Sequence, residues 1–385
     1  MSSPVTALDC FAVVTPGLEP FALTEALALG LDAVLEEGGI AWSGTARSAL
    51  LANAGLRIAS RVLVRLASFE ARSFAELERH ARKIAWSRVL VPGSAVRFRV
   101  TCKKSRLYHS DAVAQRFADA VMRALPGVRA EGGTAGEDDP AEEDEASLIV
   151  VRVMRDRVTV SADSSGALLH RRGYRQATAK APLRETIAAA MLSASVWSAD
   201  FPLVDPFCGS GTIPIEAAMR ARQMAPGAQR TFAMERWPTV SHRLGEQVRA
   251  ELAERVMPTS SAIIVGSDRD AGAIAAATSN AERAGVAADL ALAVRSLSAA
   301  QFPDSAMGWI VTNPPYGVRV GEADRVQDLW AQLGNVLRDR AAGWKVALLS
   351  PDAALDRQLR IPLRAAVKTS NGGIPVRLMI GDVPG

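Results

Sequence analysis

The second half of the chain alternates short apolar runs with longer stretches that have one apolar face. The runs predict buried strands and the stretches predict helices. A strand-helix order repeated in this way indicates an α/β domain with a doubly wound parallel sheet. The predicted strands are residues 203–205, 262–268, 290–294, 309–311, 346–350 and 376–380, and the predicted helices are residues 183–196, 213–219, 271–284 and 329–338. Residues 221–258 are longer than a normal connection and predict an inserted helical excursion, whose run 232–237 is expected beside the site.

The first half lacks that regular repeat and predicts two small α+β modules. Residues 9 to 65 read as strand, helix, strand, helix, strand. Residues 69 to 165 read as helix, strand, helix and a hairpin that turns at Arg155-Asp156, with Asp111 or Ser110 as the cap of the second helix. The predicted strands are residues 10–14, 40–43, 60–68, 94–102, 148–154 and 157–162, and the predicted helices are residues 20–35, 46–53, 74–84 and 112–125.

The strand at residues 94–102 places apolar side chains on one face and cations on the other. Its apolar face consists of Val96, Phe98 and Val100. The opposite face and the residues that follow form a cationic cluster interleaved with rings, which comprises Arg97, Arg99, Lys103, Lys104, Arg106, Arg116, Tyr108 and His109. Cations mixed with rings are typical of RNA-binding surfaces. A solvated strand edge has the same composition, so the pattern leaves both interpretations open.

Net charge adds to this picture. The chain has 45 basic and 41 acidic residues, which gives a formal net charge of +4. Residues 131–146 carry eight of the acids, so the remainder has 45 basic and 33 acidic residues and a net charge of +12. Such a body is compatible with a polyanionic partner, although solubility alone would also account for it. The glycine-rich, acidic segment itself predicts a flexible surface loop rather than a mimic of nucleic acid.

Cysteine usage and hydropathy indicate the cellular compartment in which the protein is expected. Cys10, Cys102 and Cys208 are far apart, and the four histidines are scattered. No disulfide framework or metal site is therefore expected. The first residues lack a basic segment followed by an apolar run, and no stretch approaches the roughly 18 apolar residues of a membrane span. These features predict a cytoplasmic protein that uses neither a membrane segment nor a metal ion.

One apolar strand, residues 309–311, stops abruptly in a rigid polar loop with the sequence Thr-Asn-Pro-Pro-Tyr-Gly. Two consecutive prolines cannot continue a central ladder, and the first of them favours an extended backbone at Asn313. The Asn313 side-chain oxygen and the Pro314 carbonyl are acceptors, and Tyr316 offers a ring face for stacking. Ligands bind at such strand ends, so the loop predicts a site for the planar amino group of a nucleobase. A simple proline-punctuated turn is the alternative.

Two further strands end in an acid. In residues 203–212, Asp205 precedes a turn that contains Gly209 and Gly211 and leads into a helix. Glycines admit a ligand close to the backbone, and a helix start offers free N–H groups. The lysine of a phosphate-binding loop is absent and the three-glycine dinucleotide fingerprint is incomplete. An acid before the glycines instead favours a cofactor with a cationic head, such as the amino acid end of S-adenosylmethionine. Asp268 ends the next strand and suits ribose hydroxyls, with helix capping as its alternative role.

Several motifs together resemble a known family. Three segments resemble the cofactor and target motifs of class I S-adenosylmethionine-dependent amino-methyltransferases. They are Asp205-Pro-Phe-Cys-Gly-Ser-Gly-Thr212, Gly266-Ser-Asp268 and Asn313-Pro-Pro-Tyr-Gly317. Further motifs narrow the resemblance to THUMP-domain RNA guanine-N2-methyltransferases, which include the enzyme acting on bacterial 23S rRNA. They are His170-Arg-Arg-Gly-Tyr-Arg175, Ala181-Pro-Leu-Arg-Glu185 and Glu216-Ala-Ala218, together with the regions 47–61 and 103–109, which resemble the N-terminal modules of that family.

The resemblance covers nearly the whole chain and implies its organisation and its sites. It implies an N-terminal ferredoxin-like module at 1–68, a THUMP RNA-binding module at 69–165 and a Rossmann-like methyltransferase domain at 166–385. The implied cofactor-binding residues are Asp205, Phe207, Cys208, Gly209, Ser210, Gly211, Thr212, Asp268 and Ser296. The implied target-binding residues are Asn313, Pro314, Pro315 and Tyr316. The predicted RNA-binding residues are Arg97, Arg99, Lys103, Lys104, Arg106, Tyr108, Arg172 and Arg175. One departure concerns the adenine, because many relatives carry an acid where this chain has Arg295-Ser296.

The expected reaction is methyl transfer from S-adenosylmethionine to the N2 amine of a guanosine, with 23S rRNA as the favoured target. A guanosine in tRNA and the N6 amine of adenine are alternatives, because the Asn313 loop suits any exocyclic amine. A protein that binds RNA without catalysis is a third alternative, although the intact set of Gly209, Asp268 and Asn313 weighs against it. The oligomeric state is not visible in the sequence.

Overall fold

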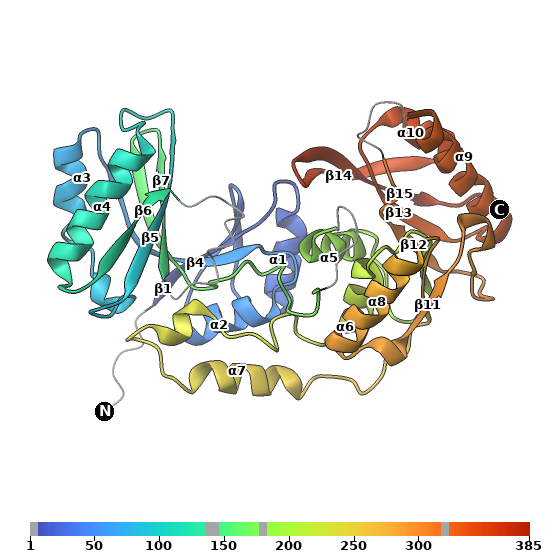
Figure 1. Ribbon diagram of the computed structural model, residues 1–385, viewed down its shortest axis with the longest axis horizontal. Helices are drawn as coiled ribbons and strands as arrows, with labels where there is room; N and C mark the ends of the chain where they lie inside the picture. Colours follow the sequence, from blue (N-terminus) through green and yellow to red (C-terminus); the bar gives the residue numbers. More distant parts are fainter. Residues whose placement is uncertain (1–6, 135–145, 177–182, 317–322) are drawn as a thin grey trace.

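The computed structural model describes residues 7–134, 146–176, 183–316 and 323–385. Their strands form two β-sheets, one in each half of the molecule (Figure 1). The elements of the N-terminal half are β1 (Leu8–Val13), α1 (Glu19–Ala28), β2 (Val34–Glu36), β3 (Gly39–Gly44), α2 (Ala46–Gly55), β4 (Arg61–Glu70), α3 (Phe74–Ala81), η1 (Trp86–Arg88), β5 (Ala95–Lys103), α4 (Ser110–Ala124), β6 (Arg129–Thr134), β7 (Ser147–Met154) and β8 (Arg157–Asp163).

The two expected N-terminal modules share a single eight-stranded sheet. Its order is β2-β3-β1-β4-β8-β7-β5-β6, and β4 pairs antiparallel with both β1 and β8. The alternation predicted for β5 is confirmed, because Val96, Phe98 and Val100 are buried in the core. The predicted hairpin is also confirmed, since β7 and β8 are joined by Arg155 and Asp156 at φ +50° and +64°. Two left-handed residues in succession suit the right-handed twist of the paired strands.

The first helix is shorter than predicted. The sequence pattern extends it from residue 20 to residue 35, but α1 ends at Ala28 and residues 34–36 form β2 instead. Gly30, at φ +78°, ends the helix, and the Leu31 N–H donates to the Ala26 carbonyl as in a Schellman motif. The apolar residues after Gly30 continue the helical spacing by chance, so the hydrophobic periodicity predicted a helix longer than α1.

Two smaller expectations for this half are also wrong. Neither Ser110 nor Asp111 caps α4, because the helix begins at Ser110 and its N-cap is His109, without a side-chain hydrogen bond. The start of the predicted acidic loop, residues 131–134, belongs to β6, which pairs in parallel with β5. The rest of that loop, residues 135–145, lies outside the described residues, as does Pro182 at the expected start of a later helix.

The C-terminal half is the predicted doubly wound α/β domain. Its seven-stranded sheet has the order β11-β10-β9-β12-β13-β15-β14, with β14 and β15 forming an antiparallel edge. Its elements are α5 (Glu185–Ala194), β9 (Leu203–Asp205), α6 (Thr212–Ala221), η3 (Ala233–Arg236), α7 (Leu244–Ala253), β10 (Ile264–Asp268), α8 (Ala271–Ala284), η4 (Ala287–Asp289), β11 (Leu290–Val294), η5 (Leu297–Ala299), β12 (Trp309–Thr312), α9 (Ala323–Arg340), β13 (Lys345–Ser350), α10 (Ala353–Leu359), β14 (Leu363–Asn371) and β15 (Ile374–Asp382). The sequence pattern missed β14 and α10.

Helices cover both faces of this sheet. Residues of α5, α6 and α8 share one apolar core with it, and residues of α9 and α10 share another. The three layers place the strand ends on a rigid scaffold. Among the described helices, none combines the length and the hydrophobicity needed to cross a membrane.

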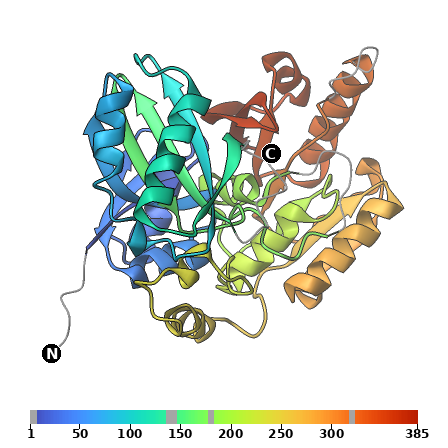
Figure 2. The same cartoon turned by 60° about the vertical axis from the view of Figure 1, so that its left-hand side comes forward.

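The inserted excursion packs against the N-terminal half. Phe232, Met234 and Trp237 belong to the same apolar core as residues of β1, β3, β4, β5, β7 and β8, and the Met234 N–H donates to the Ser164 carbonyl. α7 lies under α2 in Figures 1 and 2, which confirms the helical excursion. The expectation that residues 232–237 lie beside the site is therefore wrong, because they bind the two halves together instead.

Candidate active site at the carboxyl edge of the C-terminal sheet

The order of the C-terminal sheet reverses between β9 and β12. β10 and β11 lie on one side of this pair, and β13 lies on the other. Ligands of open α/β sheets bind beyond the carboxyl ends of the strands at such a reversal. Asp205 and Asp268 are the last residues of β9 and β10, and Asn313 directly follows β12. The structure thus brings the three polar residues singled out in the sequence to neighbouring positions along one edge.

Asp205 is a buried acid at the centre of this edge, with an exposed fraction of 1%. Its Oδ1 accepts hydrogen bonds from the Thr312 hydroxyl at 2.6 Å and from the Phe207 N–H at 3.1 Å. Burial raises the pKa of Asp205 to about 7, the two hydrogen bonds oppose that rise, and the charge of Asp268 adds to it. Ionised Asp205 is therefore costly on its own, and a cation beside it would be favoured. The Thr312 bond also ties β9 to the residue before Asn313.

The glycine turn after Asp205 has the shape expected of a cofactor loop. Gly209 and Gly211 have φ values of +53° and +86°. A Cβ built on Gly209 would meet open space, whereas one on Gly211 would come within 3.0 Å of the Ala277 side chain. Asn280, which is fully buried, donates to the Ser210 carbonyl at 3.0 Å and holds the turn from α8. Gly209 thus leaves backbone accessible to a ligand, and Gly211 lets the turn approach α8.

Asp268 is oriented by backbone donors. Its Oδ2 accepts from the Gly209 N–H at 3.2 Å and its Oδ1 accepts from the Asp270 N–H at 2.9 Å. The side chain that caps α8 is that of Asp270, which accepts from Gly272 and Ala273. Each oxygen of Asp268 keeps acceptor capacity for a ribose hydroxyl. The capping alternative therefore describes Asp270 and leaves Asp268 facing the glycine turn.

The donor set fits S-adenosylmethionine in character. A buried acid suits its cationic amino group, a second acid suits its ribose, and the open backbone at Gly209 admits a close ligand. The other residues expected to bind the cofactor are mostly buried. Cys208, Ser210 and Thr212 are buried, and Phe207 packs with the α9 core. Across the described residues, no group of three or more side chains could hold a metal ion.

Ser296 stands apart from these acids. It is exposed, lies at the start of η5, and exchanges a hydrogen bond with Ser298 at 3.1 Å. The neighbouring Arg295 N–H donates to the Asp268 carbonyl at 2.9 Å, which holds this corner beside the ribose acid. An adenine contact by Ser296 stays a prediction.

The target loop contains a buried acceptor without a donor. Asn313 Oδ1 is shielded from solvent and accepts no hydrogen bond from any described residue. Pro314 is buried and Pro315 is exposed, with the Pro315 carbonyl accepting from the Trp330 indole at 2.9 Å. The Tyr316 hydroxyl accepts from the Asn371 side chain at 2.7 Å. An unpaired buried acceptor is costly, so Asn313 is poised for an N–H donor that a ligand would bring. Gly317 lies outside the described residues.

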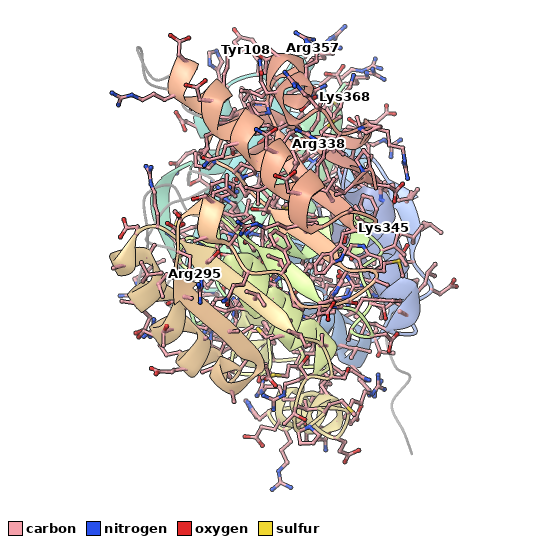
Figure 3. The ribbon with its side chains drawn as sticks, turned by 90° about the vertical axis from the view of Figure 1, so that its right-hand side faces the viewer. Tyr108, Arg295, Arg338, Lys345, Arg357 and Lys368 are labelled. Carbon is pink, nitrogen blue, oxygen red and sulfur yellow. The ribbon has the colours of Figure 1, made fainter. Side chains whose placement is uncertain are left out.

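The expected RNA-binding residues fall into two groups. Lys103, Lys104, Arg106 and Tyr108 are exposed at the end of β5, while Arg97 and Arg99 on the strand itself are half-buried. The Tyr108 ring lies 4.0 Å from that of His109. Tyr108 lies near the top of the molecule in Figure 3. The segment that follows β5 therefore presents cations next to exposed rings.

Arg172 is buried and Arg175 is half-buried, and both pair with carboxylates, so an RNA contact by either of them stays a prediction. Arg172 is 3% exposed, donates to Glu216 at 3.3 Å, and also donates to the backbone carbonyls of Leu169 and Arg57. Arg175 pairs with the buried Glu185 at 3.1 Å. Arg57 adds a third cation near Glu216, at 3.8 Å. Because a buried ion needs a partner, these arginines neutralise carboxylates at the junction between the two halves.

The sequence patterns did not identify several residues that orient the site. Thr312, Asn280, Trp330 and Asn371 each make one hydrogen bond that orients a motif residue or its loop. Thr312 carried a signal, since it stands between a buried strand and the motif. The other three lie far from the motifs in the sequence, and only the fold brings them close.

Two family models match the chain. Residues 172–379 match the RMKL-like methyltransferase domain, and residues 9–63 match the RlmL ferredoxin-like domain. Among curated proteins, "Putative RNA methyltransferase slr0064" of Synechocystis sp. is 32% identical over 97% of this chain and 96% of its own length. "Ribosomal RNA large subunit methyltransferase K/L" of Syntrophotalea carbinolica is 33% identical over 97% of this chain. The chain spans only 53% of that second, longer relative.

Solved structures extend the comparison to a bound ligand. The crystal structure of SMU.472 complexed with SAH superimposes with a TM-score of 0.85. It is 28% identical and covers 98% of this chain and 99% of its own. The arrangement of both halves is thus shared with a protein that binds S-adenosylhomocysteine, the demethylated form of the expected cofactor.

Proposed function

Because the chain belongs to the RMKL-like methyltransferase family and uses S-adenosylmethionine, we propose that it methylates the N2 amine of a guanosine in RNA, with ribosomal RNA of the large subunit as the target. The observation that carries the proposal is the buried, unpaired Asn313 oxygen. It lies one residue from Thr312, whose hydroxyl binds Asp205. An amine acceptor and a cation-binding acid are thereby held together. One relative is named as an RNA methyltransferase and another as a ribosomal RNA methyltransferase. These names favour ribosomal RNA as the substrate.

The target loop acts on an amine that is a weak nucleophile, because its lone pair is delocalised into the purine. Hydrogen bonds from its two N–H groups to the Asn313 oxygen and the Pro314 carbonyl would localise that lone pair and fix its direction. S-adenosylmethionine supplies, when bound, the electrophilic methyl group. The amine nitrogen gains a bond to the methyl carbon as the bond between that carbon and the cofactor sulfur breaks, so the positive charge passes from sulfur to nitrogen. The amine then sheds a proton readily and requires no strong base. The base must leave its stack to reach the loop, so a flipped or unpaired nucleotide is expected.

The residue assignments follow from this scheme. Asp205, with the turn from Phe207 to Thr212, holds the amino acid end of the cofactor, Asp268 holds its ribose, and Tyr316 stacks on the base. We assign residues 1–68 to a ferredoxin-like module, residues 69–165 to a THUMP RNA-binding module, and residues 166–385 to the catalytic domain. The exposed cations after β5 then bind the RNA backbone.

Analysis of nucleosides tests the proposal directly. The purified protein is incubated with S-adenosylmethionine and, separately, with unmodified ribosomal RNA, tRNA and DNA, and the digests are examined by mass spectrometry. We expect N2-methylguanosine from ribosomal RNA. N6-methyladenosine would contradict the assigned base, and a product from tRNA alone would contradict the assigned RNA. Binding of the cofactor without any methylated product would favour an RNA-binding protein without catalysis.

The cations after β5 should govern RNA affinity without touching the chemistry. Lys103 and Arg106 are exposed, so replacing both by Gln removes two phosphate partners. We expect binding about tenfold weaker, with a salt dependence shallower by about 1.4 in log-log slope, since each phosphate contact to a single strand contributes roughly 0.7. Filter binding across a salt series measures both. The matched control replaces exposed Arg243 and Arg255 beside α7, and equal losses in the two variants would contradict the assigned surface.

A further inference from the structure

The hairpin of β14 and β15 reaches beyond the sheet to the target loop. β15 pairs with β13 only as far as Arg377, opposite Ser350 at the carboxyl end of β13. The residues from Ile374 back to Asn371 therefore extend past the edge where the site lies. Gly372 and Gly373 close the hairpin at φ +57° and +81°, which allows a tight two-residue turn. The hairpin tip, residues 369–376, is thus a rigid element at the mouth of the site.

The tip makes a defined contact with the target loop. Asn371 Nδ2 donates to the Tyr316 hydroxyl at 2.7 Å. Tyr316 is half-buried and packs against the apolar cores of both faces of the sheet. On the other side, Trp330 of α9 holds the Pro315 carbonyl at 2.9 Å. The two bonds clamp consecutive residues of the loop from opposite elements, so the ring plane of Tyr316 depends on Asn371.

The stem of the hairpin is braced by the N-terminal half. Gly17 follows β1 at φ +91°, and a Cβ built on it would collide with the Lys368 carbonyl. Val367 packs against the cores of both halves. Figure 1 shows β14 projecting from its sheet toward the N-terminal half. The hairpin therefore has a fixed support at its stem and a polar contact at its tip.

We propose that Asn371 is a positioning residue, which sets the Tyr316 ring as the stacking surface for the flipped base. The inference rests on the proposed function, because it takes Tyr316 as the residue that meets the base. Asn371 touches neither base nor cofactor and acts through the Tyr316 hydroxyl alone. Its loss should slow transfer and weaken productive RNA binding while cofactor affinity stays the same, because the cofactor acids are held by separate bonds from Thr312 and Gly209.

The test compares four single variants in single-turnover methyl transfer, with the nucleic acid that the wild type methylates. Asn371→Leu removes the bond, Asn371→Asp restores it with the Tyr316 hydroxyl as donor, and Tyr316→Phe removes the other partner. Ser370→Ala, on the exposed outer face of the same strand, is the matched control. We expect about a tenfold loss of kcat/KM for Asn371→Leu, most of it recovered in Asn371→Asp, and wild-type rates for Ser370→Ala.

A double-mutant cycle separates positioning from simple stability. If Asn371 acts through Tyr316, the double variant is no slower than Tyr316→Phe alone. Fully additive losses, or a normal rate for Asn371→Leu in an active enzyme, would overturn the inference and leave the proposed function intact. A wild type that methylates adenine would instead overturn the proposed base, and the cycle would still measure the coupling. Thermal unfolding and S-adenosylhomocysteine affinity, both expected to be unchanged, exclude a general defect.

Discussion

Replacing Asn313 by Ala should lower the rate of methyl transfer by about a thousandfold, the loss seen when one preorganised hydrogen-bonding group is removed from a transition state. The side-chain oxygen is buried and accepts no hydrogen bond from the described residues, so its removal relieves a cost in the free protein. Folding should therefore be unaffected or slightly favoured. Cofactor affinity should be unchanged, because Asp205 is held by Thr312 and not by Asn313. Single-turnover transfer and calorimetry with S-adenosylhomocysteine measure the two quantities separately.

Asn313→Asp provides the matched comparison. A carboxylate keeps an acceptor at the same place and should retain far more of the rate than Ala does. If Ala and Asp are equally slow, the acceptor is not what the loop contributes. If Asn313→Ala transfers methyl groups at a near-normal rate, the amine is not held here at all and the proposed function fails.

The sequence alone located the strand ends that carry the proposed site residues. β9, β10 and β12 are short runs that begin with apolar residues and end in a polar one. Asp205, Asp268 and Asn313 therefore fell on neighbouring strands once the β-α repeat was recognised. The helix predicted from about Ala271 to Ala284 is also confirmed, as α8.

The edge strands β2 and β14 were not predicted, because their hydrophobic patterns are weak. β14 alternates apolar residues with exposed Arg364 and Lys368, and it pairs on one side only, with β15. β2 is three exposed residues. Neither carries the apolar run that marks a buried strand. The hairpin that contacts Tyr316 was invisible for this reason, although its tip borders the site.

Charge in the sequence does not reveal whether a cation faces water or a buried acid. Arg172 and Arg175 stand in a run of basic residues that resembles a nucleic-acid contact, but they pair with Glu216 and Glu185. The Arg172 partner lies 44 residues away. Only the packing of α5 and α6 brings these carboxylates to the junction, so no local pattern could have identified them.

Asp205 should make cofactor affinity depend on pH. Burial raises its pKa to about 7, the hydrogen bonds from Thr312 and Phe207 lower it, and Asp268 raises it. The neighbouring Cys208 thiol is kept neutral, because burial raises its pKa well above the usual value. A cationic ligand binds the ionised carboxylate, so affinity should fall as protons occupy Asp205. S-adenosylhomocysteine should bind about tenfold more weakly at pH 6 than at pH 8, since the ionised fraction changes by that factor.

The raised pKa of Asp205 has the opposite effect on the stability of the free protein, because that stability falls as the pH rises. A carboxyl whose pKa is raised by folding favours the native state while it is protonated, and that contribution is lost as pH rises through about 7. Asp205→Asn abolishes the charge and should keep the bonds from Thr312 and Phe207. We expect it to bind S-adenosylhomocysteine about a hundredfold more weakly, with no pH dependence between 6 and 8, and to be at least as stable as the wild type at pH 8. Calorimetry and thermal unfolding at both pH values measure these effects. Affinity that is flat with pH in the wild type, or intact in Asp205→Asn, would mean that the cationic head of the cofactor binds elsewhere.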